Sequence, residues 1–156
     1  MNRFHKRLPT RRSIAGFSMI EVLIAILVLA MGLLGYALLQ TMNLRYTQSA
    51  NYRTVATNLA HDLLDQMRAN RLSAAKYGSL ASFTAGSVPV DDGCTRSTGS
   101  VTAEETVERW QCSVVVALGP DAAADVSYTD GVANVSISWG ERVESGSTTF
   151  AVSTRL

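Results

Sequence analysis

Residues 16–44 read GFSMIEVLIAILVLAMGLLGYALLQTMNL, and this stretch decides how the chain is organised. From Val22 to Leu44 it contains 23 consecutive residues without a charge. As an α-helix, such a run measures roughly 34 Å, which is enough to cross a hydrocarbon core of about 30 Å. Glu21, the only acidic residue of the stretch, stands directly before the uncharged run. The sequence therefore predicts a membrane-spanning helix with a carboxylate at its threshold.

Basic residues stand before the apolar run rather than after it. The first sixteen residues contain five Lys or Arg and no acid, and the next basic residues are Arg45 and Arg53. The positive-inside rule therefore predicts a cytoplasmic N-terminus, with everything after Leu44 on the outer side. A secretory signal peptide is the competing interpretation, but this apolar run is long and no A-x-A-like site closes it. The small residues Ala15 and Gly16 precede the run, so a cut there leaves the apolar helix in the product.

The segment Gly16-Phe17-Ser18-Met19-Ile20-Glu21, between a basic leader and an apolar helix, resembles a type IV prepilin signal. The resemblance implies that a prepilin peptidase cuts between Gly16 and Phe17 and that the new Phe17 amine is methylated. Glu21 matches the family's acidic residue at the fifth mature position, which suggests pairing between Glu21 and the Phe17 amine of a neighbouring subunit. The alternative is an ordinary membrane anchor with an incidental Glu. A carboxylate costs about 2.5–3.5 kcal/mol at the centre of a membrane helix, and less at the helix start.

A helical pattern continues beyond the apolar run. No proline or glycine occurs between residues 36 and 71, and apolar residues recur there at intervals of three or four, as on one face of a helix. The members of this stripe are Tyr52, Ala56, Leu59, Leu63 and Met67. We therefore expect one helix of about fifty residues, with the stripe packed under a globular domain. The predicted divisions are a cleaved leader 1–16, a transmembrane helix half 17–44, an amphipathic helix half 45–72 and a β-rich periplasmic or extracellular domain 73–156.

The last part of the chain carries the signals of a small sheet. Residues 73–106 are rich in Ser, Thr, Gly and Ala and predict a long, mostly irregular connection. Strand signals follow at 110–116, 132–139 and 148–152, and turn signals at Asp130-Gly131 and 144–147. We expect an α+β protein in which an antiparallel sheet of three or four strands packs on the long helix, a plan that resembles the type IV pilin fold. Trp110 and Trp139 are interpreted as core residues rather than as ligand platforms.

The two cysteines, Cys94 and Cys112, both follow the membrane segment and therefore lie in an oxidising compartment. Pairing them would close a loop worth roughly 3 kcal/mol and would pin the irregular segment to the first predicted strand. The only histidines are His5, in the leader, and His61, on the helix. The sequence thus predicts a disulfide, no metal site and no cofactor.

The charge balance bears on the class of function. From Leu72 onward, five basic residues face ten acidic ones, so this region is a poor binder of polyanions and no nucleic acid is expected as a partner. The same region contains no histidine, and its only thiols are the two cysteines. The adjacent acids Asp91-Asp92 and Glu104-Glu105 lie in loop-like sequence and are interpreted as solvated charge. We therefore predict no catalytic residues and no enzymatic activity.

Further segments resemble the PilV-type minor pilins, the type IV pilus modification proteins. They are the helix end LAHDLLDQMRANR, the strand end VSISWGER and the short final strand. This resemblance implies a subunit that helps to prime pilus assembly and joins the tip complex, and so contributes to pilus biogenesis, adhesion and twitching motility. Many major pilins carry a proline near residues 36–39, where this chain has none, and the difference fits a low-copy subunit.

The implied partners are the prepilin peptidase, other minor and major pilins, the inner-membrane assembly platform, the lipid bilayer and a tip adhesin. The implied location is the inner membrane, crossed once with the C-terminal domain in the periplasm, and then the pilus on the cell surface. Two alternatives stay open. The chain could be a minor pseudopilin of a type II secretion system, or a pilus-associated surface-binding module for adhesion or DNA uptake.

Overall fold

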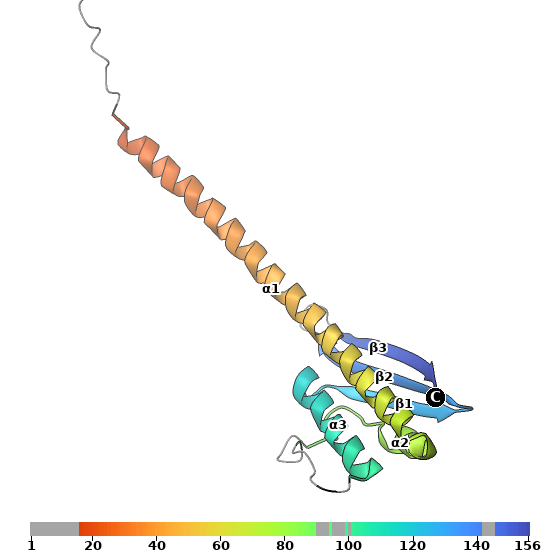
Figure 1. Ribbon diagram of the computed structural model, residues 1–156. Helices are drawn as coiled ribbons and strands as arrows, with labels where there is room; N and C mark the ends of the chain where they lie inside the picture. The colour runs from red at the N-terminus through yellow and green to blue at the C-terminus, as the bar shows by residue number, and fades with distance from the viewer. Residues whose placement is uncertain (1–15, 90–93, 95–98, 100, 142–145) are drawn as a thin grey trace, which may run out of the picture. The chain divides into compact units, whose positions relative to one another are not determined.

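The computed structural model describes residues 16–89, 94, 99, 101–141 and 146–156 (Figure 1). Contacts divide the chain into two compact units, Met1–Thr41 and Met42–Leu156, and the first helix contributes residues to both. The helices are α1 (Met19–Ala69), the short 3-10 turn η1 (Arg71–Ser73), α2 (Ala74–Leu80) and α3 (Ala103–Leu118). The strands are β1 (Ala123–Thr129), β2 (Val132–Glu141) and β3 (Gly146–Arg155). The predicted α+β class, with a long N-terminal helix and a small antiparallel sheet, is confirmed.

Helix α1 has the predicted length, with 51 residues. In the first unit every described residue of the helix is exposed, and this part is long and apolar enough to cross a membrane by length and composition. In the second unit the helix buries one face in the core. Of the predicted stripe, Ala56, Leu63 and Met67 are buried, whereas Tyr52 and Leu59 are half-buried.

The sheet is antiparallel throughout, with the strand order β1-β2-β3. The predicted turn at Asp130-Gly131 joins β1 to β2, and both residues have positive φ values of 53° and 78°, as a two-residue hairpin turn requires. The predicted strands 132–139 and 148–152 are confirmed within β2 and β3. Along β2, Val135, Ile137 and Trp139 point into the core. The predicted turn at 144–147 lies partly outside the described residues.

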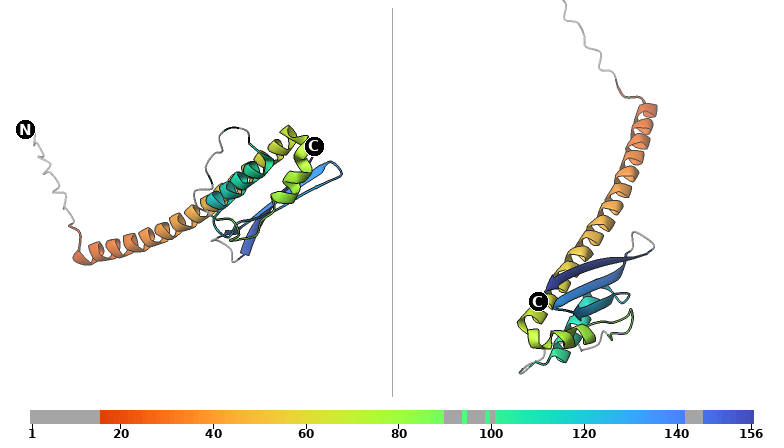
Figure 2. Two further views of the ribbon diagram at one scale, coloured as in Figure 1. Left: turned by 90° about the horizontal axis from the view of Figure 1, so that it is seen from below. Right: turned by 90° about the vertical axis from the view of Figure 1, so that its right-hand side faces the viewer.

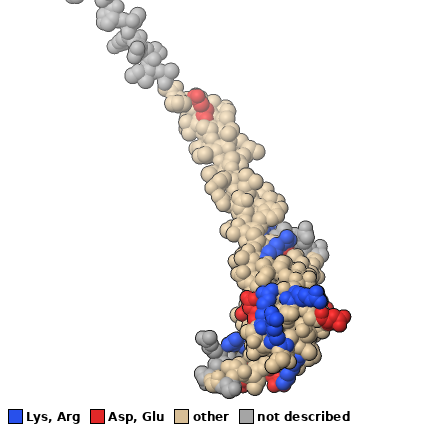
Figure 3. All heavy atoms as spheres, turned by 45° about the vertical axis from the view of Figure 1, so that its right-hand side comes forward, with Lys and Arg blue, Asp and Glu red and all other residues tan. Residues whose placement is uncertain are grey.

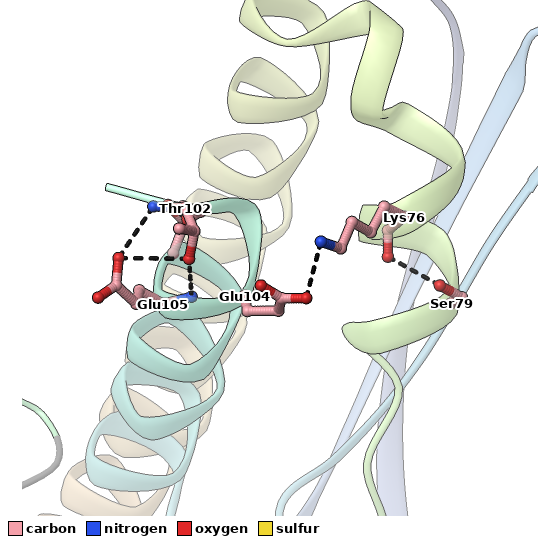
Figure 4. A network of polar contacts seen from close by, with 6 residues as sticks. Lys76, Ser79, Thr102, Glu104 and Glu105 are labelled. Carbon is pink, nitrogen blue, oxygen red and sulfur yellow. Dashed lines mark hydrogen bonds and ion pairs between the residues drawn. The ribbon is translucent and has the colours of Figure 1, made fainter. Parts of the chain in front are cut away.

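The strand predicted at 110–116 is wrong, because these residues belong to α3. Thr102 caps the helix through a reciprocal pair of hydrogen bonds: its Oγ1 accepts from the Glu105 N–H at 3.3 Å, and its own N–H donates to Glu105 Oε2 at 2.9 Å (Figure 4). The buried residues of α3 follow helical spacing. They include Val107, Trp110, Val114 and Leu118. The run of three valines at 114–116 suggested a strand, but the cap and the helical stripe determine the structure.

Both tryptophans are core residues, as predicted. Trp139 on β2 is completely buried and Trp110 on α3 is 2% exposed. The Trp110 indole Nε1 donates a hydrogen bond to the backbone carbonyl of Leu59 at 2.8 Å, which ties α3 to α1. The Phe83 ring meets Trp110 edge-on, with ring centroids 6.3 Å apart. The core therefore lies between one face of the sheet and helices α1 and α3 (Figure 2).

Two further elements were not predicted. Strand β1 begins with Ala123-Ala124-Asp125, which gives no β-branched or alternating apolar signal. Helix α2 lies within the segment that was expected to be mostly irregular, and it packs closely on β1. A Cβ atom added at Gly78 in α2 would lie 3.0 Å from the Cβ of Tyr128 and 3.1 Å from its backbone nitrogen. A residue without a side chain at this position is what allows α2 to approach the strand.

The structure joins Cys94 to Cys112 by a disulfide, with Cα atoms 5.5 Å apart. Cys112 is buried in α3, so the bond attaches the preceding segment to this helix and not to a strand as expected. Cross-linking of residues 18 positions apart stabilises a domain by about 3 kcal/mol when the bond restricts the unfolded chain.

Replacing Gly78 by valine should destabilise the second unit, because the new side chain would collide with Tyr128 on β1. We expect the free energy of unfolding to fall by about 1–3 kcal/mol. Denaturant unfolding of the detergent-solubilised chain measures this, with Ser79→Val on the exposed side of the same helix as the control. Equal stability of the Gly78→Val and Ser79→Val proteins would contradict the close approach of α2 to β1.

Removing the disulfide by Cys94→Ser should lower the free energy of unfolding of the second unit by about 3 kcal/mol and reduce the amount of protein in the cell. Mass mapping of peptides under non-reducing conditions provides the complementary test on the wild-type protein. Two free thiols in native material would show that Cys94 and Cys112 do not pair.

Candidate functional site

The start of α1 is the candidate site, and Ser18 organises it. The Ser18 Oγ accepts a hydrogen bond from the backbone N–H of Glu21 at 3.3 Å. Its carbonyl oxygen accepts from the N–H groups of Glu21 and Val22, at 3.1 Å and 3.3 Å. Ser18 is therefore the N-cap of a helix whose first helical residue is Met19. The sequence analysis missed this role, although the order Ser-Met-Ile-Glu has the S-x-x-E spacing typical of a helix start.

Phe17 lies directly before this cap, outside the regular helix, and is 82% exposed. Because the cap is formed by Ser18, separation of Gly16 from Phe17 would leave every described hydrogen bond of the helix start intact. A new amine at Phe17 would then stand one residue before the positive end of the helix dipole. The geometry is thus compatible with a chain that begins at Phe17.

Glu21 shares one face of the helix with Phe17 and with apolar side chains. A shallow hollow on this face is lined by Phe17, Glu21, Val22, Ala25, Ile26 and Leu29. Figure 3 shows the apolar part of α1 without basic side chains on the face in view and with acidic atoms only near its start. The carboxylate therefore lies at one end of an apolar stripe, in the first turn of the helix, where the dipole favours a negative charge.

No packing contact among the described residues requires a glycine at position 16. A Cβ atom added to it would meet no atom within 4 Å, and its φ angle does not lie in the left-handed region that favours glycine. The fold of the described residues therefore does not require glycine at this position. A requirement for glycine there would have to come from a molecule that recognises the segment.

Of the adjacent acids that the sequence singled out, Glu104 and Glu105 have structural roles. Glu104 and Glu105 were expected to lie in a loop, but they form the first turn of α3. Glu105 completes the cap on Thr102, and Glu104 Oε1 lies 2.7 Å from the Lys76 Nζ of α2 (Figure 4). Asp91 and Asp92 lie outside the described residues. Within the described ranges, no group of three His, Cys, Asp or Glu side chains could hold a metal ion.

Comparison with known proteins gives two matches that adjoin each other along the chain. Residues 11–37 match the prokaryotic N-terminal methylation motif, which includes Gly16, Phe17 and Glu21. Residues 38–114 match a family described as type IV pilin Tt1218, from the apolar part of α1 to the middle of α3. No curated protein and no solved structure matches the chain. In its motif, its family match and its fold, the chain resembles type IV pilins that carry a prepilin methylation motif.

Proposed function

We propose that the chain is a prepilin that is cut between Gly16 and Phe17, methylated at Phe17 and then incorporated into a type IV pilus as a minor subunit. The observation that carries the proposal is the arrangement at the start of α1. A glycine without a structural task precedes an exposed phenylalanine, and a capped helix then presents one carboxylate beside a long apolar surface. Proteins of the pilin family are structural, and the methylation motif implies a prepilin peptidase and other pilins as partners.

The apolar surface explains why assembly is needed. Large side chains such as Leu23, Leu27 and Leu34 are each about three-fifths or more exposed in the single chain. Burying apolar surface contributes about 25 cal/mol per Å², so a lipid bilayer or neighbouring helices must cover this segment. In the membrane the lipid does so, and in a fibre the same segments of other subunits would take its place. The chain crosses the inner membrane once in this proposal, with its second unit in the periplasm before assembly.

Within such an environment, Glu21 needs a cationic partner. A charge pair interacts far more strongly in an apolar medium than in water, and an unpaired carboxylate there is costly. The amine of Phe17 in a neighbouring subunit is the partner that the motif offers, since it stands at nearly the same depth as Glu21. This pair would set the vertical register of an incoming subunit, and the apolar stripe would supply the packing.

A minor, PilV-like role is supported by the continuity of α1. The helix runs unbroken from Met19 to Ala69, and no proline interrupts it near residues 36–39. A subunit of this kind would take part in priming the pilus and in the tip complex, together with other minor pilins, the assembly platform and an adhesin at the tip. Adhesion and twitching motility would then depend on it indirectly, through the number of pili.

Substituting Gly16 by leucine should leave the leader attached, because the peptidase would meet a bulky side chain where the wild-type chain has none. The substitution should leave the fold of the second unit unchanged. Mass spectrometry of the membrane-extracted protein should show the leader residues still attached before Phe17 and no methylated Phe17. Ser13→Leu, a bulky change elsewhere in the leader, is the control. Normal cleavage of the Gly16→Leu chain would contradict the assigned cutting position.

Glu21→Gln keeps the size of the side chain and removes its charge, so it should leave insertion and leader cleavage largely intact while lowering incorporation into pili. Glu21→Asp should have a milder effect, because the charge remains on a shorter arm. The measurement is the amount of this subunit in sheared pili relative to that in membranes, for wild type and both variants. If Glu21→Gln enters pili as well as wild type, the pairing is wrong and Glu21 serves in recognition by the peptidase or the assembly platform.

A further inference from the structure

Within the described residues, the two edges of the sheet differ in whether their backbone groups have hydrogen-bond partners. At the β1 edge, Phe83 and Ala124 exchange two backbone hydrogen bonds of 2.9 Å and 3.0 Å. Beside them, the Ser82 Oγ bonds to both the N–H and the carbonyl of Val126. At the opposite edge, no described backbone group outside β2 bonds to β3. Figures 1 and 2 show β3 as an outermost strand. One edge is therefore covered and the other is open.

The hydrogen bonds fix which groups of β3 face outward. The N–H of Leu156 donates to the carbonyl of Gly131 at 2.9 Å, and these residues continue the β2–β3 register by one pair. Because directly opposed pairs alternate between bonded and non-bonded in an antiparallel ladder, every second residue of β3 bonds to β2. The residues that bond inward are Thr148, Phe150, Val152 and Thr154. The N–H and C=O groups that point to the open edge belong to Ser147, Thr149, Ala151, Ser153 and Arg155.

The open edge lacks the features by which edge strands usually avoid pairing. Such strands are kept short, carry lysine or proline, or contain a bulge. The segment 146–154 has no charge and no proline, and β3 as a whole, with Arg155 as its last residue, pairs with β2 in ten consecutive positions. Its Thr, Val and Phe residues favour extended structure. The strand is therefore a template for another strand along most of its length.

The surroundings of the edge define the chemistry of a partner. Phe150 and Val152 on the core side are only half-buried and pack at the border of the core. On the other side of the sheet, the exposed side chains of Thr149, Ala151 and Ser153 are small. A partner strand with apolar residues on one face would cover Phe150 and Val152 and would place small or polar residues on the other face.

A second copy of this chain does not fit the edge in a symmetric pair. Helix α1 runs in the same direction as β3. The Ser49 Oγ donates to Glu141 Oε1 at 2.9 Å, and Glu141 of β2 pairs with Gly146 at the start of β3. Near the end of β3, the Arg68 Nη2 donates to Thr154 Oγ1 at 2.6 Å. Pairing two antiparallel β3 strands would make these helix segments run in opposite directions. Subunits that leave one membrane run in the same direction. The other sheet edge of a copy is covered by Ser82 and Phe83, so the observations favour a strand from a different protein.

We propose that the β3 edge is an interaction surface that accepts an extended strand from a different pilin subunit, so that the sheet continues from one subunit into the next. This inference rests on the proposed function, since it places both proteins in the same fibre. The main-chain groups of β3 would supply the affinity, and Phe150 and Val152 would select apolar residues on the core face of the partner strand. The contact is separate from the membrane half of α1 and would distinguish one neighbour from another.

Proline at residue 151 tests the edge. Ala151→Pro removes an outward N–H and places a ring at the edge, while the bonds of β3 to β2 stay possible because proline is tolerated at the open side of an edge strand. Ala151→Thr keeps the N–H and is the matched control. Val152→Pro, one residue further, removes an inward N–H and should destabilise the domain. Each variant is made in the full chain and expressed in piliated cells. Leader cleavage, disulfide formation and the amount of protein in the membrane are measured as checks on folding. The readout is the amount of the subunit in pili divided by its amount in membranes.

We expect the Ala151→Pro chain to be cleaved and to accumulate in membranes like the wild-type chain. Its amount in sheared pili should be about fivefold lower than that of wild type, because one hydrogen bond of about 1 kcal/mol is lost. Ala151→Thr should enter like wild type. Should Ala151→Pro lower the membrane amount, Ala151→Lys, which places a charge at the edge, decides instead. Unchanged entry of the deciding variant overturns the inference and leaves the proposed function standing. Absence of the wild-type chain from pili overturns both.

A photo-reactive benzoylphenylalanine in place of Thr149 identifies the occupant. Its side chain lies next to the edge, and the same group at Ser138, on the central strand of the same face, is the control. After irradiation of intact pili, we expect the Thr149 probe to attach to an extended segment of a different pilin, with little product from Ser138. Attachment to a second copy of this chain, or equal products from both positions, would contradict the proposed partner.

Discussion

The exposed apolar surface of the first half of α1 is the constraint on which the rest of the structure depends. The backbone of this segment satisfies its own hydrogen bonds as a helix, but its side chains from Val22 to Leu44 cannot remain in water. They need lipid or the same surface of other subunits. This requirement explains why the only carboxylate between Met19 and Leu44 stands in the first turn of the helix, where the dipole reduces its cost. It also explains why the second unit is built on the later part of the same helix, which carries one buried face instead of an apolar surface all round.

The second unit uses the buried face of α1 as one wall of its core. Leu63 and Met67 meet the inner side of the sheet, and the hydrogen bond from Trp110 to the carbonyl of Leu59 holds α3 alongside. The disulfide then fixes Cys94 to α3, and the covered β1 edge closes the sheet on one side. Among the described residues the β3 edge has no second strand beside it, and a strand of another subunit would pair there in the proposed assembly. An assembly subunit can thus have two kinds of contact: a general one between apolar helices and a selective one at the sheet.

Sequence patterns predicted the elements whose periodicity is long or regular. The long helix followed from a stripe repeated over several turns, and β2 and β3 followed from alternation at Val135, Ile137 and Trp139 and from the adjoining turn signals. The secondary-structure prediction failed where the local composition favours one element and the packing with distant residues favours another. The valines at 114–116 favour strands, yet the Thr102–Glu105 cap and the buried stripe through Trp110 make a helix. Strand β1 is formed because it pairs with β2 along its length and because Gly78 lets α2 approach it at Tyr128, a condition that no short pattern reveals. At the site, Gly16, Phe17 and Glu21 came from the motif, whereas the capping role of Ser18 was overlooked.

The central claim is that this protein leaves the membrane as a processed subunit of a fibre. The most direct measurement is the intact mass of the wild-type chain recovered from pili sheared off the cells, under non-reducing conditions. We expect a chain that begins with methylated Phe17 and contains the Cys94–Cys112 bond. A chain found only in the membrane fraction, with its first sixteen residues still attached, would contradict it.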